Sequence, residues 1–83
     1  MTHRSVKRLS EAILSLNPDV LGRVTVDRMQ TALRLLKGTG KMTSTQRAEF
    51  QPCLDHASEH VVDLAKDLLA AFEMYREAGN VPE

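Results

Sequence analysis

Two histidines one helical turn apart form the pattern in this sequence that comes nearest to a catalytic motif. They are His56 and His60 in "HASEH", which matches H-x-x-E-H, the inverted zinc-protease signature, with Glu59 in the acidic position. A catalytic zinc needs a third protein ligand and a cavity that excludes bulk water. In the heptad pattern described below, all three residues lie outside the apolar arc. The spacing therefore predicts solvent-exposed side chains and disfavours a protease.

Two weaker forms of histidine chemistry stay open. Asp63 and Asp67 continue the row of His56 and His60, so a surface site for a divalent metal is one alternative. A phosphotransfer histidine is the other, although neither histidine has the neighbouring lysine and small residues that such a site needs. We predict no catalytic residue, no cofactor and no metal, and keep His56 and His60 as weak candidates for metal ligands.

Cys53 is the single cysteine, so no disulfide can form within one chain. That count fits a reducing, intracellular compartment. We expect a small, half-buried thiol at the edge of an interface. An intersubunit disulfide or a redox sensor is the alternative, but the basic neighbourhood that activates a thiolate is absent.

Apolar periodicity divides the chain of 83 residues into three helices within a single domain spanning 1–83. The predicted helices span about 5–16, 25–37 and 44–78. The interior they predict is aliphatic, because the chain has only two Phe, one Tyr and no Trp. The glycine-rich loop "GTGKMTST" separates the second helix from the third and lacks the spacing of a phosphate-binding loop.

The third predicted helix carries the strongest pattern. Apolar residues alternate in steps of four and three from Phe50 to Ala78, and Pro52 is expected to kink or restart the helix near its beginning. A second apolar row runs beside the first, at Val62, Ala65, Leu69 and Phe72. One hairpin cannot cover both rows, so we predict a homodimer built on this helix. The predicted core and dimer residues are Phe50, Leu54, Val61, Leu64, Leu68, Phe72 and Tyr75.

The predicted fold class is therefore all-α. An antiparallel hairpin of two long helices, preceded by a short N-terminal helix, would form a helical-bundle homodimer. No apolar run approaches the roughly 20 residues of a membrane span, and the N-terminal stretch is too polar for a signal peptide. We expect a cytoplasmic protein that does not contact the membrane.

Charge is unevenly distributed although the net charge is zero. Residues 1–47 hold nine Lys and Arg against three Asp and Glu, whereas residues 48–83 hold two against eight. The basic half has no recognisable DNA-recognition helix and no aromatic stacking residues, so direct nucleic-acid binding is not favoured. An exposed acidic row is either a solubilising face or a docking surface for a basic partner. Its members are Asp55, Glu59, Asp63 and Asp67.

The segment "LNPDVLGRVTVDRMQTALRLL", followed by a loop, a long helix and the closing "GNVP", resembles the TraM family. Members of this family are antiactivators of LuxR-type, TraR-like quorum-sensing regulators. The chain is shorter than expected of the family, mostly in the loop between the helices.

The resemblance implies two long antiparallel helices, a dimer and a function without catalysis. Family members bind the LuxR-type transcriptional activator, prevent it from holding its operator DNA and so repress conjugal transfer genes. The alternatives are another small helical interaction protein, such as a secretion chaperone or a phage-borne inhibitor, and, with less support, a His-dependent metal or phosphotransfer domain.

Overall fold

The computed structural model describes residues 5–78, and the side chains of residues 5–74 among them. The described residues form five helices and no strand, which confirms the all-α class. The helices are α1 (Val6–Leu14), α2 (Pro18–Leu21), α3 (Arg23–Gly38), α4 (Ser44–Leu54) and α5 (Glu59–Ala78).

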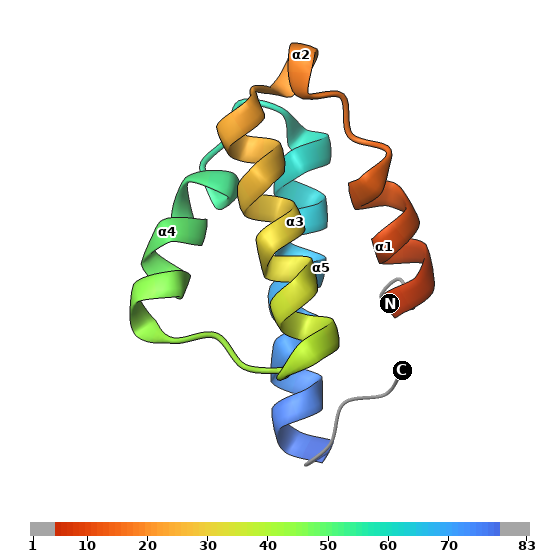
Figure 1. Cartoon of the computed structure of the whole chain (residues 1–83), viewed down its shortest axis with the longest axis vertical. Coiled ribbons are helices and arrows are strands. Elements are labelled where there is room, and N and C mark those ends of the chain that lie inside the picture. Colours follow the sequence, from red (N-terminus) through yellow and green to blue (C-terminus); the bar gives the residue numbers. More distant parts are fainter. Residues whose placement is uncertain (1–4, 79–83) are drawn as a thin grey trace.

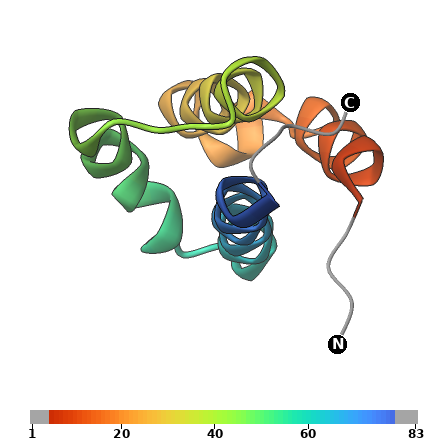
Figure 2. The same cartoon turned by 90° about the horizontal axis from the view of Figure 1, so that it is seen from below.

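Helices α3 and α5 lie side by side at the centre, with α1 on one side and α4 on the other (Figures 1 and 2). Both flanking helices contact both central helices, and within the described residues they do not contact each other. The central helices run in one direction and the flanking helices in the other (Figure 1). The antiparallel partner of α3 along the chain is therefore α4, and α5 returns parallel to α3.

The predicted single helix over 44–78 is wrong, because the structure divides it into α4 and α5. Pro52 lies inside α4 and cannot donate to the carbonyl four residues earlier, and the helix ends two residues later at Leu54. The cap residue Asp55 donates its backbone N–H back to the Pro52 carbonyl. The break reverses the chain, so the heptad positions before and after it lie on different helices.

Local capping signals place the other helix ends. Ser5 accepts from the Arg8 backbone N–H at 3.2 Å, and Asn17 accepts from the Asp19 N–H at 2.9 Å. Helix α3 starts at Arg23, two residues before its predicted start. This is possible because Gly22 adopts φ 97°, so that α2 ends and α3 begins with no longer loop between them.

The loop between α3 and α4 is held tightly at both ends. Gly40, at φ 70°, donates its backbone N–H to the Leu35 carbonyl at 2.9 Å and so closes the end of α3. Thr43 and Gln46 form a reciprocal capping box at the start of α4, with bonds of 3.1 and 2.8 Å. The loop fixes α4 beside α3 at this end.

One core joins the helices. Five of the seven predicted core residues are buried within this single chain, with Val61, Leu64 and Leu68 fully inaccessible and Phe50 and Phe72 nearly so. Leu54 is partly buried against the core, and the side chain of Tyr75 lies outside the described residues.

Helix α1 provides the cover that the sequence analysis assigned to a second subunit. It packs against α5 and α3 and buries Leu9 and Ile13 completely. In the second apolar row of α5, Ala65 is fully buried and Leu69 is partly buried against the core. The apolar width of α5 therefore no longer argues for a homodimer, and the dimer stays a prediction.

Candidate functional site

His56 lies in the linker between α4 and α5, where its side chain joins two backbone segments. Its Nδ1 accepts the Ser58 backbone N–H at 3.0 Å, and its Nε2 lies 3.3 Å from the Leu21 carbonyl oxygen at the end of α2. A nitrogen that accepts an N–H carries no proton, so the proton must sit on Nε2, where it can be donated to Leu21. With both nitrogens engaged, His56 has a structural role in connecting the linker to α2.

His60 is separated from His56 by the helix break. It lies exposed in the first turn of α5, which Ser58 caps through its Oγ at 3.5 Å from the Val61 backbone nitrogen. The predicted continuous row of His56, His60, Asp63 and Asp67 is therefore wrong, because His56 is not on α5. Among the residues that the structure describes, no group of three His, Cys, Asp or Glu side chains could hold a metal ion.

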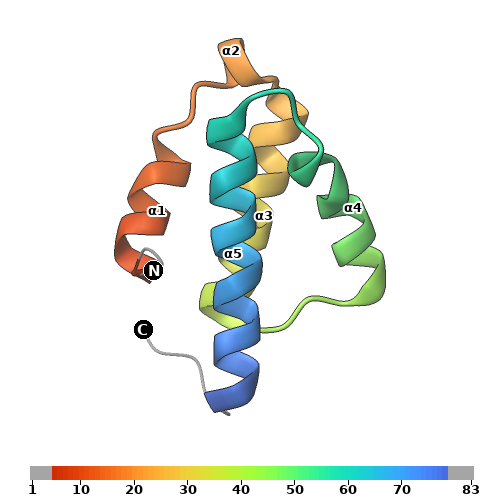
Figure 3. The same cartoon turned by 180° about the vertical axis from the view of Figure 1, so that it is seen from behind.

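Only part of the predicted acidic row lies on one helix in the structure. Glu59, Asp63 and Asp67 follow one another at intervals of four residues on α5, so they share one face of the helix. Glu59 and Asp63 are exposed, whereas Asp67 is half-buried. Asp55 lies apart from them at the end of α4. Figure 3 shows α5 in front of α3, with no other helix in front of it.

Cys53 is buried more deeply than the sequence analysis expected. Only 1% of its surface is exposed, and its Sγ lies 3.9 Å from the Thr25 carbonyl oxygen. Burial raises the pKa of the thiol, and the positive charge of Arg28 opposes that shift in part. A protonated thiol inside the core is a poor nucleophile, and an intersubunit disulfide would require α4 to move.

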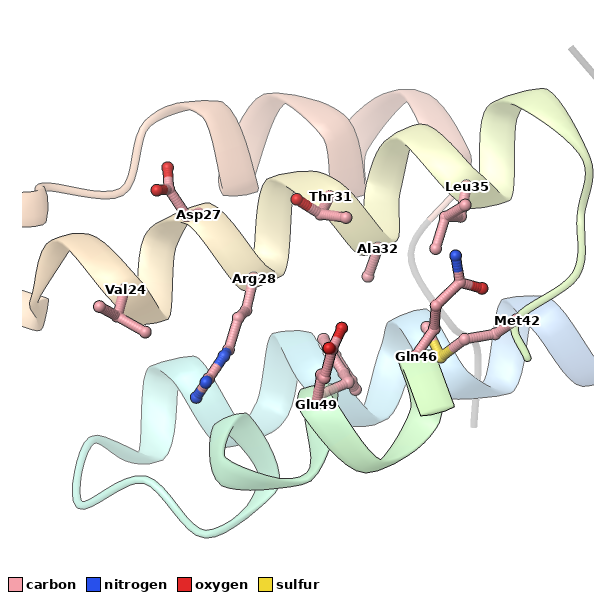
Figure 4. A pocket seen from close by; sticks show the side chains of 10 residues that line it. Val24, Asp27, Arg28, Thr31, Ala32, Leu35, Met42, Gln46 and Glu49 are labelled. Atoms are coloured by element: carbon pink, nitrogen blue, oxygen red, sulfur yellow. The ribbon is translucent and has the colours of Figure 1, made fainter. Parts of the chain in front are cut away.

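A cleft between α3 and α4 brings together residues that the sequence analysis did not single out as a site. Its volume is about 250 Å³. Phe50, Ala32, Leu35, Met42 and Val24 supply its apolar lining. Figure 4 shows Arg28 reaching across from α3 towards α4, with Glu49 rising from α4 towards α3.

The sequence contained one signal for this cleft. Val24, Arg28, Thr31 and Leu35 recur at helical spacing on α3, beside the buried stripe that faces α1 and α5. This second row mixes apolar and polar residues, and only the position of α4 shows that it lines a cleft. We call the cleft the α3–α4 groove.

No helix in the described part of the chain is long and apolar enough to cross a membrane. Comparison with protein-family models, with curated proteins and with solved structures found no match to this chain. The resemblance to the TraM family therefore rests on the sequence segments quoted above.

Proposed function

We propose that this protein is a cytoplasmic antiactivator, which binds a LuxR-type transcriptional activator and keeps it from its operator DNA. The observation that carries the proposal is the outer face of α5, where Glu59 and Asp63 are exposed one turn apart. DNA-binding domains carry basic surfaces for the phosphate backbone, and an acidic helix face is complementary to such a surface. The resemblance to the TraM family supplies the identity of the partner.

The proposed mechanism is competition for one basic surface. Core residues such as Leu64 and Leu68 occupy the opposite side of α5, so the outer face can bind a partner without disturbing the fold. Glu59 and Asp63 would approach the basic residues with which the activator holds phosphates. Because long-range attraction mainly speeds association, the complex should form more slowly as ionic strength rises.

Charge reversal on this face tests the proposal. We expect the double variant Glu59→Lys/Asp63→Lys to bind a purified LuxR-type activator from the same cell about tenfold more weakly, mainly through slower association. A charge-matched control, Glu11→Lys/Asp19→Lys, changes two exposed acids on α1 and α2 and should bind normally. Fluorescence anisotropy of labelled operator DNA measures whether the activator is released.

If both double variants bind the activator with equal affinity, the outer face of α5 is not the binding surface. Failure of the unmodified protein to bind the activator or release it from DNA would overturn the proposed function. In that case another helical interaction protein, such as a secretion chaperone or a phage-borne inhibitor, becomes the better hypothesis.

A homodimer is a separate proposal and needs a different interface from the one first predicted. Val61, Leu64 and Leu68 are already buried inside one chain, so a dimer would have to use surface residues. The apolar candidates among the described residues are the strongly exposed Leu14, Val20, Val24 and Met74. Light scattering of the purified protein across a range of concentrations measures its mass and shows whether it is a monomer or a dimer.

A further inference from the structure

The α3–α4 groove has an apolar floor between two charged side chains. Phe50 is only 2% exposed and forms part of the floor, while Val24, at one end, is 61% exposed. Leu35 and Met42 close the other end (Figure 4). The apolar surface that a ligand can reach in the groove therefore comes from Val24, Leu35 and Met42, with Phe50 beneath them.

Arg28 and Glu49 lie along the same groove (Figure 4), and neither side chain makes a hydrogen bond or an ion pair with any residue in the described part of the chain. Arg28 is half-buried, so its charge is partly removed from water, and no described carboxylate forms an ion pair with it. A ligand that fills the groove should therefore bring an acidic group to Arg28 and a basic group to Glu49.

The dimensions of the groove favour a helix as its occupant. On α3 it extends from Val24 to Leu35, twelve residues whose eleven steps span about 16 Å of helix. Three turns of a partner helix span the same length and present apolar residues at intervals of three and four. A small molecule is a poorer fit, since the groove is open along one side and ligand pockets enclose most of their ligand.

A second copy of this chain does not offer such a helix. Its strongly exposed large apolar residues are scattered singly over the described helices: Leu14 on α1, Val20 on α2, Val24 on α3 and Met74 on α5. Among the side chains of residues 5–74, no helix carries two of them, so none of these presents an apolar row that could fill the groove. This distribution favours a different protein as the occupant.

We propose that the α3–α4 groove binds one amphipathic helix of the partner protein, whose apolar side packs on Val24 and Leu35 while an acidic residue pairs with Arg28 and a basic residue with Glu49. The inference rests on the proposed function for the identity of that partner, the activator. It adds a second contact surface on a different side of the molecule from the outer face of α5. The groove supplies apolar contact that resists dissociation, and α5 supplies charge that speeds encounter.

Two pairs of matched variants test the groove in binding assays with the purified activator. Val24→Glu places a charge in the groove, and Val20→Glu makes the same change at an exposed valine on α2. Glu49→Lys reverses a groove charge, and Glu11→Lys reverses an exposed charge on α1. We expect the groove variants to weaken binding by about tenfold or more, mostly through faster dissociation, and the controls to bind normally.

A photoreactive amino acid at position 24 identifies what occupies the groove, and the same group at position 20 is the control. The expected product is a crosslink from position 24 to a helical segment of the activator with apolar residues three and four apart. Crosslinks between two copies of this chain would overturn the inference, as would normal binding by both groove variants.

The experiment separates the two proposals. If the groove variants bind normally while Glu59→Lys/Asp63→Lys loses affinity, the groove inference fails and the proposed function stands. If the unmodified protein does not bind the activator at all, the proposed function fails and the groove inference fails with it.

Discussion

Helices α1 and α4 flank the same central pair but use their residues differently. Helix α1 places Leu9 and Ile13 one turn apart, and both are fully buried between α3 and α5. Helix α4 buries Phe50 and Cys53, while Gln46 and Glu49 line the α3–α4 groove. The aliphatic stripe of α1 packs without interruption against α3 and α5. The interrupted stripe of α4 leaves Gln46 and Glu49 beside the core and a groove between α4 and α3.

The comparison predicts that both flanking helices are essential to the fold, each through very few side chains. Phe50→Ala should reduce the free energy of unfolding by about 3–5 kcal/mol and Ile13→Ala by about 2–5 kcal/mol, because each leaves a cavity at a fully packed position. Urea denaturation followed by circular dichroism measures both. If either variant does not fold, Phe50→Leu and Ile13→Val give milder values. A negligible loss for Phe50→Ala would mean that α4 is not docked on the core.

The linker that follows α4 gives a sharper test, since two histidines four residues apart should behave differently. His56→Ala removes a side chain bonded to Ser58 and Leu21, and should reduce the free energy of unfolding by about 1–3 kcal/mol because the linker loses both partners. His60→Ala changes an exposed side chain and should alter the stability by less than about 0.5 kcal/mol. Equal effects in thermal melts would contradict the structural role of His56.

The smallest expected effect concerns the thiol on the buried side of α4. Burial raises the pKa of Cys53 above its ordinary value of 9.0. Between that value and the higher folded-state pKa, the unfolded chain has lost a proton that the folded chain retains. The free energy of unfolding should therefore fall as pH rises from about 9 upwards, by up to about 1.4 kcal/mol per pH unit from this group.

The measurement is the stability of the protein from pH 8 to pH 10, compared with that of Cys53→Ala. The variant should show a shallower decline, whatever its absolute stability, because it lacks the titrating thiol. Parallel curves for the two proteins would mean that Cys53 is not held protonated by burial. A thiol reagent should correspondingly react slowly with the native protein and rapidly in urea.

Much of the helical content could be predicted from local residue patterns. The stripe that contains Leu9 and Ile13, the cap at Ser5 and the capping box at Thr43 act within one or two turns, so the sequence is sufficient to locate the starts of α1 and α4. Most of the predicted core residues on α5 are buried for the same reason. The resemblance to the TraM family, the homodimer and the partner stay predictions.

The candidate sites were less predictable, because each depends on how distant segments meet. The heptad pattern passes through 55–58 without interruption, so it gave no warning that His56 would leave the helix and contact Leu21, 35 residues away. Pro52 indicated where the helix is interrupted but not how, since a proline inside a helix can produce a bend or a break. The α3–α4 groove could be predicted only from the position of α4, and no periodicity on α3 specifies that position.

By itself the sequence determined that the chain is helical and which residues make up the apolar stripes, since spacing and caps act over a few residues. Only the tertiary structure decided what each apolar side contacts. The wide apolar arc of α5 is compatible with a second subunit or with cover from the same chain, and the chain reversal at 55–58 together with the docking of α1 selects the second. The physical reason is that apolar burial has no preferred direction or partner: any matching surface satisfies it, and the chain's own helices are tethered closest.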